Sequence, residues 1–363
     1  MFLFHNYLPY TYIRHDPCQL CPGKHLKSQK IFTPPKPPHK RLSRDETARQ
    51  WVYKNVLFSG AYDLKGYTLK RDKISDLVSR LNQGDFRVLA KLLTQLDQWS
   101  FNAADIKGLF NDAGPFSLRL GITGPPGAGK STIINELIRY FRSKDFTVGV
   151  LAVDPSSPFT RGAILGDRIR YSEFFNDPKV YIRSLGSRGS LGGLSASTYL
   201  MLRAYDLMKF DIVLVETVGV GQTELDIMNV ADILSVVLVP ESGDSIQAMK
   251  AGLLEITNLF LVNKADRPGS ETFSNELKAT LDIASSKANE SKIFKTVATE
   301  SKGITEFCDY ILDQKKTIDL TKKRNDPSLL QNEALSILKH IREQELIKKV
   351  EQIKSPSELI DLF

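Results

Sequence analysis

The sequence contains few cysteines and no long apolar run, and each of these absences excludes a class of protein. Three cysteines in 363 residues are too few for the disulfide framework of a small secreted domain, so we expect a reducing compartment. The apolar runs have the length of a strand, for example residues 236–239, whereas crossing a bilayer takes about 20 apolar residues. The sequence therefore predicts no contact with a membrane.

The folded part of the chain also lacks an excess of charge. The formal net charge is +7, but residues 1–44 hold eight Lys and Arg against a single acidic residue, Asp16. The rest of the chain carries 41 basic and 41 acidic side chains, so no positive surplus remains for a nucleic-acid groove. We therefore expect no nucleic-acid partner.

The first 46 residues have the composition of a flexible leader. Residues 1–44 contain seven of the 17 prolines and four of the five histidines, a mixture that cannot bury a core. A basic, acid-poor leader resembles an organelle transit segment, so we predict a mitochondrial location, with the cytoplasm as the alternative. The spacing of the potential zinc ligands His15, Cys18, Cys21 and His25 matches no standard finger, and metal binding there stays open.

Residues 118–132 carry the strongest signal in the chain. Apolar residues typical of a buried strand lead into Gly124, Pro125, Pro126, Gly127, Ala128, Gly129, Lys130, Ser131 and Thr132, after which a helical pattern begins. In this strand–turn–helix context the pattern G-x-x-x-x-G-K-[ST] predicts a phosphate-binding loop. Its backbone N–H groups and the helix dipole bind phosphate, Lys130 reaches the β- and γ-phosphates, and the Ser131 hydroxyl ligates Mg²⁺.

Strands and helices alternate from residue 118 onward, which predicts an α/β fold with a doubly wound, mainly parallel sheet. We expect strands at residues 118–123, 147–153, 179–184, 211–216, 233–239, 258–263 and 293–298. Apolar stripes at residues 73–97 predict two helices in an N-terminal helical region, residues 47–114. The nucleotide-binding domain then covers residues 115–315. Further stripes predict a C-terminal helical region, residues 316–363, that is either a domain cover or a dimer surface.

Acidic residues follow two of these strands, close to the expected phosphate site. Glu216 ends one strand and Asp154 another, and Asp167 lies in the loop beyond. Carboxylates at these positions are candidates for the Mg²⁺ shell or the attacking water. Gly219 and Gly221, in the loop after Glu216, suit a backbone that approaches the γ-phosphate and moves after hydrolysis, and Gln222 follows them as a further switch residue.

Asn263, Lys264 and Asp266 form an N-K-x-D motif after a later strand. The Asp266 carboxylate can accept hydrogen bonds from both N1–H and the 2-amino group of guanine, a pattern that adenine lacks. The turn after the next strand, Val297, Ala298 and Thr299, is where a backbone N–H commonly faces guanine O6. The motif therefore predicts GTP and not ATP as the ligand.

Longer motifs resemble the methylmalonyl-CoA mutase-associated GTPases, a SIMIBI-class family that includes proteins once labelled arginine/ornithine transport kinases. They lie at residues 152–167, 188–195, 216–224, 243–252 and 263–266, and the resemblance covers about residues 70–350. It implies a usually homodimeric P-loop GTPase that acts as a chaperone of a cobalamin-dependent mutase and gates delivery of adenosylcobalamin. It also implies catalytic roles for Lys130, Asp154 and Glu216, and a mobile third switch containing Asp244 and Lys250.

The chain departs from the family pattern at a few positions, and other functions stay open. Ser245 and Ala248 alter the third switch, Ser190 replaces a common histidine, and Val297 stands where serine is usual. One alternative is a kinase or ATPase linked to arginine/ornithine transport; another is a nickel-type metallochaperone GTPase. A third is a protein that uses GTP only as a conformational latch.

Overall fold

The structure is a computed structural model, and it describes residues 74–100, 116–154, 170–186, 194–217, 226–242, 257, 259–284 and 291–350. All of them belong to one compact unit, Asp63–Phe363. The predicted leader, with His15, Cys18, Cys21 and His25, lies outside the described residues.

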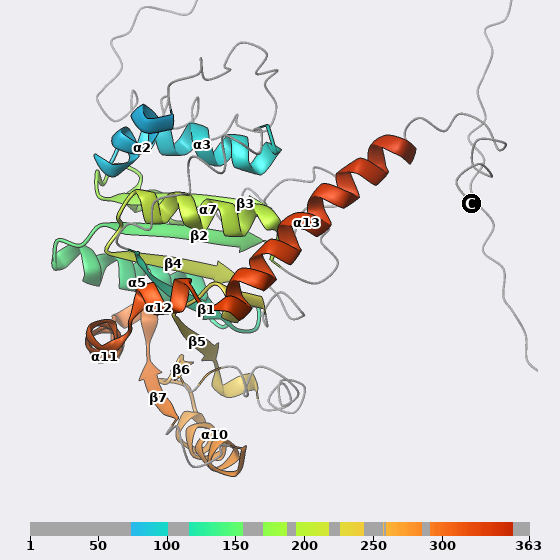
Figure 1. The fold of residues 1–363 in the computed structure, drawn as a ribbon. Coiled ribbons are helices and arrows are strands. Elements are labelled where there is room, and N and C mark those ends of the chain that lie inside the picture. The colour runs from blue at the N-terminus through green and yellow to red at the C-terminus, as the bar shows by residue number, and fades with distance from the viewer. Residues whose placement is uncertain are drawn as a thin grey trace, which may run out of the picture. The chain divides into compact units, whose positions relative to one another are not determined.

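The described strands form one parallel sheet of seven strands, which confirms the predicted fold class. The strands are β1 (Leu118–Thr123), β2 (Val148–Asp154), β3 (Val180–Gly186), β4 (Ile212–Thr217), β5 (Ile233–Leu238), β6 (Leu259–Asn263) and β7 (Lys292–Thr296). Their order is β3-β2-β4-β1-β5-β6-β7, so β1 lies between β4 and β5 (Figure 1). Every expected strand is present within two residues of its predicted bounds. The inner strands have nearly continuous apolar runs because they are buried on both faces, whereas the edge strands β3 and β7 are partly exposed.

Helices cover both faces of this sheet (Figure 1). One apolar cluster joins the sheet to α5 (Lys130–Ser143) and α11 (Ile304–Thr317). The opposite face packs against α7 (Ala196–Leu207), and α2 (Ile74–Asn82) and α3 (Phe86–Gln98) share that cluster. On β5 and β6, a third cluster contains α10 (Ser270–Ala284). Short turns of 3₁₀-helix complete this part: η1 (Ser172–Phe174), η2 (Ile227–Asn229), η3 (Pro240–Ser242) and η4 (Ala298–Glu300).

The two N-terminal helices form as their apolar stripes predict. Asp85 caps α3, accepting hydrogen bonds from the N–H groups of Arg87 and Val88, and such caps stabilise a helix by about 1 kcal/mol. The helix ends at Trp99, whose backbone is left-handed and whose indole N–H donates to Ser197 Oγ on α7 over 2.9 Å. The helix pair is therefore a cover bound to α7.

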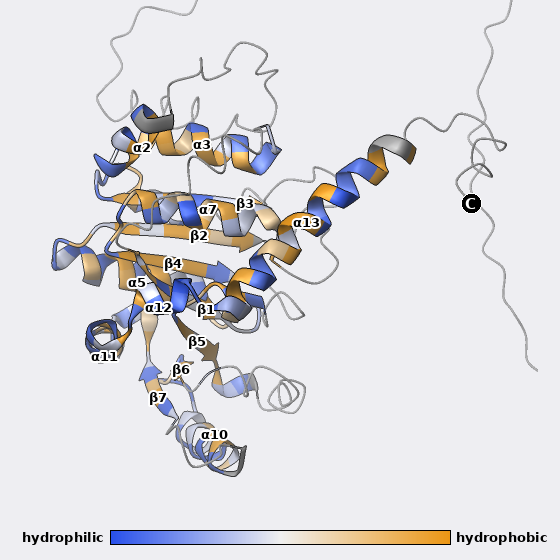
Figure 2. Cartoon of the chain, viewed as in Figure 1, coloured by the Kyte–Doolittle hydropathy of each residue, from blue (hydrophilic) through white to orange (hydrophobic). Residues whose placement is uncertain are grey.

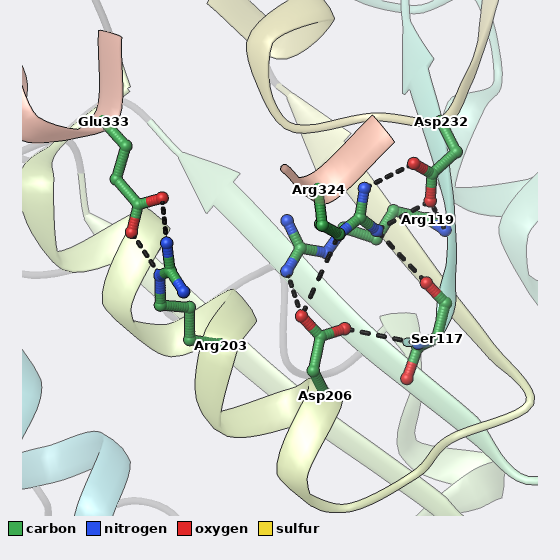
Figure 3. Close-up of polar contacts among 7 residues, drawn as sticks. All are labelled: Ser117, Arg119, Arg203, Asp206, Asp232, Arg324 and Glu333. Carbon is green, nitrogen blue, oxygen red and sulfur yellow. Dashed lines mark hydrogen bonds and ion pairs between the residues drawn. The ribbon is translucent and has the colours of Figure 1, made fainter. Parts of the chain in front are cut away.

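A buried ion network attaches the C-terminal helices α12 (Leu320–Arg324) and α13 (Pro327–Val350) to the sheet (Figure 3). Arg324 pairs with Asp232, the residue before β5, and lies 3.9 Å from Asp206 of α7. Arg119 of β1 pairs with the same Asp206. These residues lie at the start of β1 and β5, so the network anchors the C-terminal helices at the amino-terminal ends of the central strands, opposite the loop that follows β1.

The helix α13 runs beside α7 and presents apolar residues to both protein and solvent (Figures 1 and 2). Glu333 pairs with Arg203 of α7, and Ile337 packs against the α7 cluster. The large apolar residues that stay exposed on this helix are Leu330, Leu335, Leu338, Ile341, Leu346, Ile347 and Val350. Of the helices in the described part of the chain, none is long and apolar enough to cross a membrane.

Candidate nucleotide site

The loop that joins β1 to α5 needs glycine at two positions where neighbouring strands approach it. Gly124 has φ +138°, and a Cβ there would lie 2.2 Å from the carbonyl oxygen of Val237 in β5. Gly129 has φ +90°, and a Cβ would lie 2.4 Å from Nδ2 of Asn263 in β6. Both positions combine a positive φ with a close contact, so the shape of the loop requires glycine there.

Lys130 begins α5 and its side chain is buried across the loop. Its ammonium group donates to the carbonyl oxygens of Gly124 at 2.6 Å and Pro125 at 3.0 Å. The preceding residue, Gly129, has no side chain to cap the first N–H groups of the helix, where Ser131 and Thr132 follow Lys130. A helix N-terminus with an adjacent lysine is suited to bind an anion such as phosphate.

The carboxylate of Glu216 lies directly beside Ser131. Because β4 neighbours β1, with Ile122 opposite Glu216, the end of β4 lies next to the start of the loop. The Ser131 hydroxyl donates to Glu216 Oε1 over 2.8 Å, and the Tyr171 hydroxyl donates to Oε2. The structure therefore brings Ser131 and Glu216 together at the end of the sheet where the loop begins.

Burial raises the pKa of Glu216, which is 2% exposed, although the hydrogen bonds from Tyr171 and Ser131 and the charge of Lys130 act in the opposite direction. A buried carboxylate beside a hydroxyl is a pair of hard oxygen donors, the kind that Mg²⁺ prefers. A cation there would offset the cost of burying the charge. The residues present therefore fit the predicted metal.

The N-K-x-D residues connect the phosphate-binding loop to the turn after β7. Asn263 Nδ2 donates to the carbonyl oxygen of Ala128 over 2.9 Å, and its Oδ1 accepts from Thr296 Oγ1 and the Ala298 N–H. Lys264 donates to the carbonyl oxygen of Gly127 over 2.9 Å. The phosphate loop and the predicted guanine loop are thus tied together through two adjacent residues.

The residues predicted to read the base belong to the N-K-x-D turn and to the turn after β7, which Asn263 joins. Asp266 and Thr299 are exposed, whereas Val297 and Ala298 are buried. The Ala298 N–H, which the sequence predicts to face guanine O6, donates in this structure to Asn263 Oδ1 at 3.1 Å. Its contact with the base stays a prediction.

The side chains of several predicted site residues lie outside the described part of the structure. Asp154 is the last residue of β2, paired in register with Gly186 of β3, and only its backbone is described. The remaining predicted residues, Asp167, Gly219, Gln222, Asp244 and Lys250, lie outside the described residues.

The structure also brings two residues to the site that the sequence did not indicate. Arg170 Nη1 donates to Ser131 Oγ over 3.1 Å, and Tyr171 binds Glu216. Neither residue belongs to a motif with a known spacing from the phosphate loop, so no pattern in the sequence indicates them.

The described residues contain no group of three or more His, Cys, Asp or Glu side chains that could hold a metal by itself. Cys308 belongs to the buried face of α11, and burial raises the pKa of its thiol. The potential zinc ligands His15, Cys18, Cys21 and His25 lie outside the described part.

A phosphate loop after β1, an acid ending the neighbouring strand and an N-K-x-D turn after β6 define a P-loop GTPase. Residues 90–355 match the family described as "Methylmalonyl Co-A mutase-associated GTPase MeaB". The chain is 42% identical over 299 residues to a putative GTPase of Pyrococcus horikoshii, an alignment that covers 80% of this chain and 92% of that one. The chain belongs to the MeaB family and is a GTPase.

Two further similarities concern a mitochondrial relative and a solved structure. The mouse protein named "Methylmalonic aciduria type A homolog, mitochondrial" is 34% identical over 206 residues, which are 55% of this chain and 50% of that one. The crystal structure of an LAO/AO transport system kinase superposes with a TM-score of 0.57 at 24% identity, covering 77% of this chain and 87% of that one. This second similarity shows the fold.

Proposed function

We propose that this GTPase is a chaperone of methylmalonyl-CoA mutase or a related cobalamin-dependent mutase, which it protects and for which it gates adenosylcobalamin loading. The observation that carries the proposal is the family match, because residues 90–355 include both the nucleotide site and the C-terminal helices. The name of the mouse relative, which refers to methylmalonic aciduria, supports the same client.

Hydrolysis in this proposal depends on positioning and charge, with water as the nucleophile. Lys130 stabilises charge that develops on the transferred phosphoryl group. Ser131, Glu216, Asp154 and Asp167 supply oxygen ligands or hold water at the metal side. Mg²⁺ held by these residues would supply positive charge that offsets the negative charge of the phosphates. We expect slow intrinsic turnover that the mutase accelerates, and an intrinsic rate of several per second would contradict this expectation.

The experiment that tests the client is co-purification with methylmalonyl-CoA mutase, with GTP hydrolysis followed in the presence and absence of the mutase. A complex with accelerated phosphate release is the expected result. Binding without acceleration favours the latch alternative and directs attention to the altered third switch. Labelled γ-phosphate on an acceptor instead of free phosphate would favour the kinase alternative, and no binding would refute the client.

Guanine selection is assigned in this proposal to Asp266, supported by its position three residues after Asn263, which contacts the phosphate loop. In Asp266→Asn the amide no longer accepts two hydrogen bonds from guanine, and its NH₂ group can donate to the 2-carbonyl of xanthine. Loss of bonds to a charged group costs about 1.5–3 kcal/mol each, so we expect GTP affinity to fall at least about tenfold and xanthosine triphosphate affinity to rise. Asp76→Asn on α2 is the matched control, and an unchanged preference for GTP would contradict the assignment.

Homodimerisation through α13 is supported by its exposed apolar residues, of which Leu338 is 62% exposed. Association would remove these side chains from water, which stabilises the dimer by about 25 cal/mol for each Å² of apolar surface that is buried. We expect a dimer in light scattering, and we expect Leu338→Glu to convert it to a monomer. Gln344→Glu adds the same charge at an exposed polar position of α13 and keeps the dimer. A monomeric parent protein would refute the proposal.

A mitochondrial location is supported by the name of the mouse relative and by the basic composition of residues 1–44. Fusion of residues 1–46 to a reporter tests it through import into isolated mitochondria. We expect import that depends on the membrane potential. A reporter that stays outside would favour the cytoplasm.

A further inference from the structure

Tyr171 is a core residue whose one polar atom contacts the nucleotide site. Its side chain is fully buried at the start of η1, in the apolar cluster formed with α5 and the sheet. Its hydroxyl donates to Glu216 Oε2. Since the ring is packed among apolar side chains, the core itself determines where this hydroxyl lies.

The carboxylate of Glu216 accepts hydrogen bonds on both oxygens from different elements. Ser131, in the first turn of α5, binds Oε1, and Tyr171 binds Oε2. The final torsion of a glutamate side chain has broad energy wells, so a single donor leaves the carboxylate plane free to rotate. Two donors on opposite oxygens fix this plane and keep Oε1 directed toward Ser131.

We propose that Tyr171 is a positioning residue for GTP hydrolysis, which holds the Glu216 carboxylate so that Oε1 faces Ser131 at the metal side of the phosphate loop. This inference rests on the proposed function, in which Ser131 and Glu216 are oxygen donors at the metal site. Groups that orient the ligands of a metal typically change its affinity or the activity about 10–100-fold when they are removed.

A second buried tyrosine offers a comparison in which the hydroxyl has a structural role. Tyr205 of α7 is also fully buried, and its hydroxyl donates to the carbonyl oxygen of Val150 over 2.9 Å. Its ring belongs to the apolar cluster on the other face of the sheet. Tyr205→Phe therefore removes a buried hydroxyl without removing a contact to Glu216.

The test follows release of GDP carrying a fluorescent ribose label from the full chain as Mg²⁺ is varied, because Mg²⁺ slows release when it binds beside the phosphates. For Tyr171→Phe we expect the Mg²⁺ concentration of half-maximal slowing to rise about 10–100-fold. GDP affinity in EDTA and the unfolding temperature should stay close to those of Tyr205→Phe. Should the Phe variant fail to fold, Tyr171→Met removes the same hydroxyl with a side chain that adapts to irregular space.

A double-mutant cycle with Glu216→Gln separates this inference from the proposed metal site. If Tyr171 acts through Glu216, adding Tyr171→Phe to Glu216→Gln produces no further change in Mg²⁺ dependence. A normal Mg²⁺ dependence of Tyr171→Phe, with that of Glu216→Gln altered, would overturn the role of Tyr171 alone. An unaltered Glu216→Gln would overturn the metal site itself, and additive effects would show that Tyr171 acts elsewhere.

Discussion

Replacing Arg324 by methionine removes the cation that holds the C-terminal helices to the sheet. The Arg324 side chain is 11% exposed and that of its partner Asp232 is fully buried (Figure 3). The guanidinium donates to both oxygens of Asp232 and, over 3.2 Å, to the carbonyl oxygen of Ser117. Methionine keeps the apolar stem of Arg324 and has no donor, so the Asp232 carboxylate loses its ion pair while the packing of the stem is retained.

The magnitude follows from what remains around Asp232. Breaking a buried ion pair by removing one partner costs about 3–5 kcal/mol, because an uncompensated charge stays buried. Asp232 still accepts the Arg119 backbone N–H at 2.7 Å, and the charge of Arg119 still interacts with it, which favours the lower end of about 3 kcal/mol. At about 2–4 °C per kcal/mol for a domain of this size, the unfolding temperature should fall by about 6–12 °C.

Circular dichroism during heating measures this change, and limited proteolysis shows whether α12 and α13 detach. Arg342→Met on α13 is the matched control, because Arg342 forms an exposed pair with Glu345, and such pairs contribute under about 1 kcal/mol. Adding Asp232→Asn to Arg324→Met neutralises the unpaired charge, keeps an acceptor for Arg119 and should restore part of the loss. An unfolding temperature within about 2 °C of the parent, with unchanged proteolysis, would refute the reasoning.

Two other substitutions test the nucleotide site. Glu216→Gln should stabilise the protein at pH 7 when nucleotide and Mg²⁺ are absent: burial raises the pKa of Glu216 above its usual 4.5, so the parent loses stability as the pH rises through the folded-state value. The unfolding temperature of Glu216→Gln should therefore exceed that of the parent by an amount that grows from pH 4.5 to 7. A difference that shrinks over this range would contradict the raised pKa of Glu216. Gly129→Ala should lower GTP affinity at least about tenfold in an equilibrium titration, since its Cβ would displace Asn263, a loss of about 1.4 kcal/mol or more. Gly269→Ala has a similar φ of +85° and open space around its Cβ; equal affinity losses in both variants would mean that backbone strain alone is responsible.

The helices at the two ends of the chain show how far the apolar pattern reaches. The stripe of α3 predicted a buried face, and its leucines are buried against the α7 cluster. Apolar residues also recur along α13, yet Ile337 packs against protein while Leu338 stays exposed. Periodicity identifies an apolar face but not what covers it, because the covering surface belongs to another part of the chain or another molecule.

The sequence by itself determined the class of protein. The phosphate loop and the N-K-x-D motif can be read from the sequence because each places its binding groups within a few consecutive residues. The inner strands were predictable because burial on both faces requires nearly continuous apolar residues. Only the tertiary structure showed that Tyr171 contacts Glu216, that Asn263 contacts Ala128, and that Arg324 pairs with Asp232. These partners are 45, 135 and 92 residues apart. The residues around a side chain in the sequence do not indicate a partner so far away in the chain. Only the packing of the sheet and its helices brings the two together.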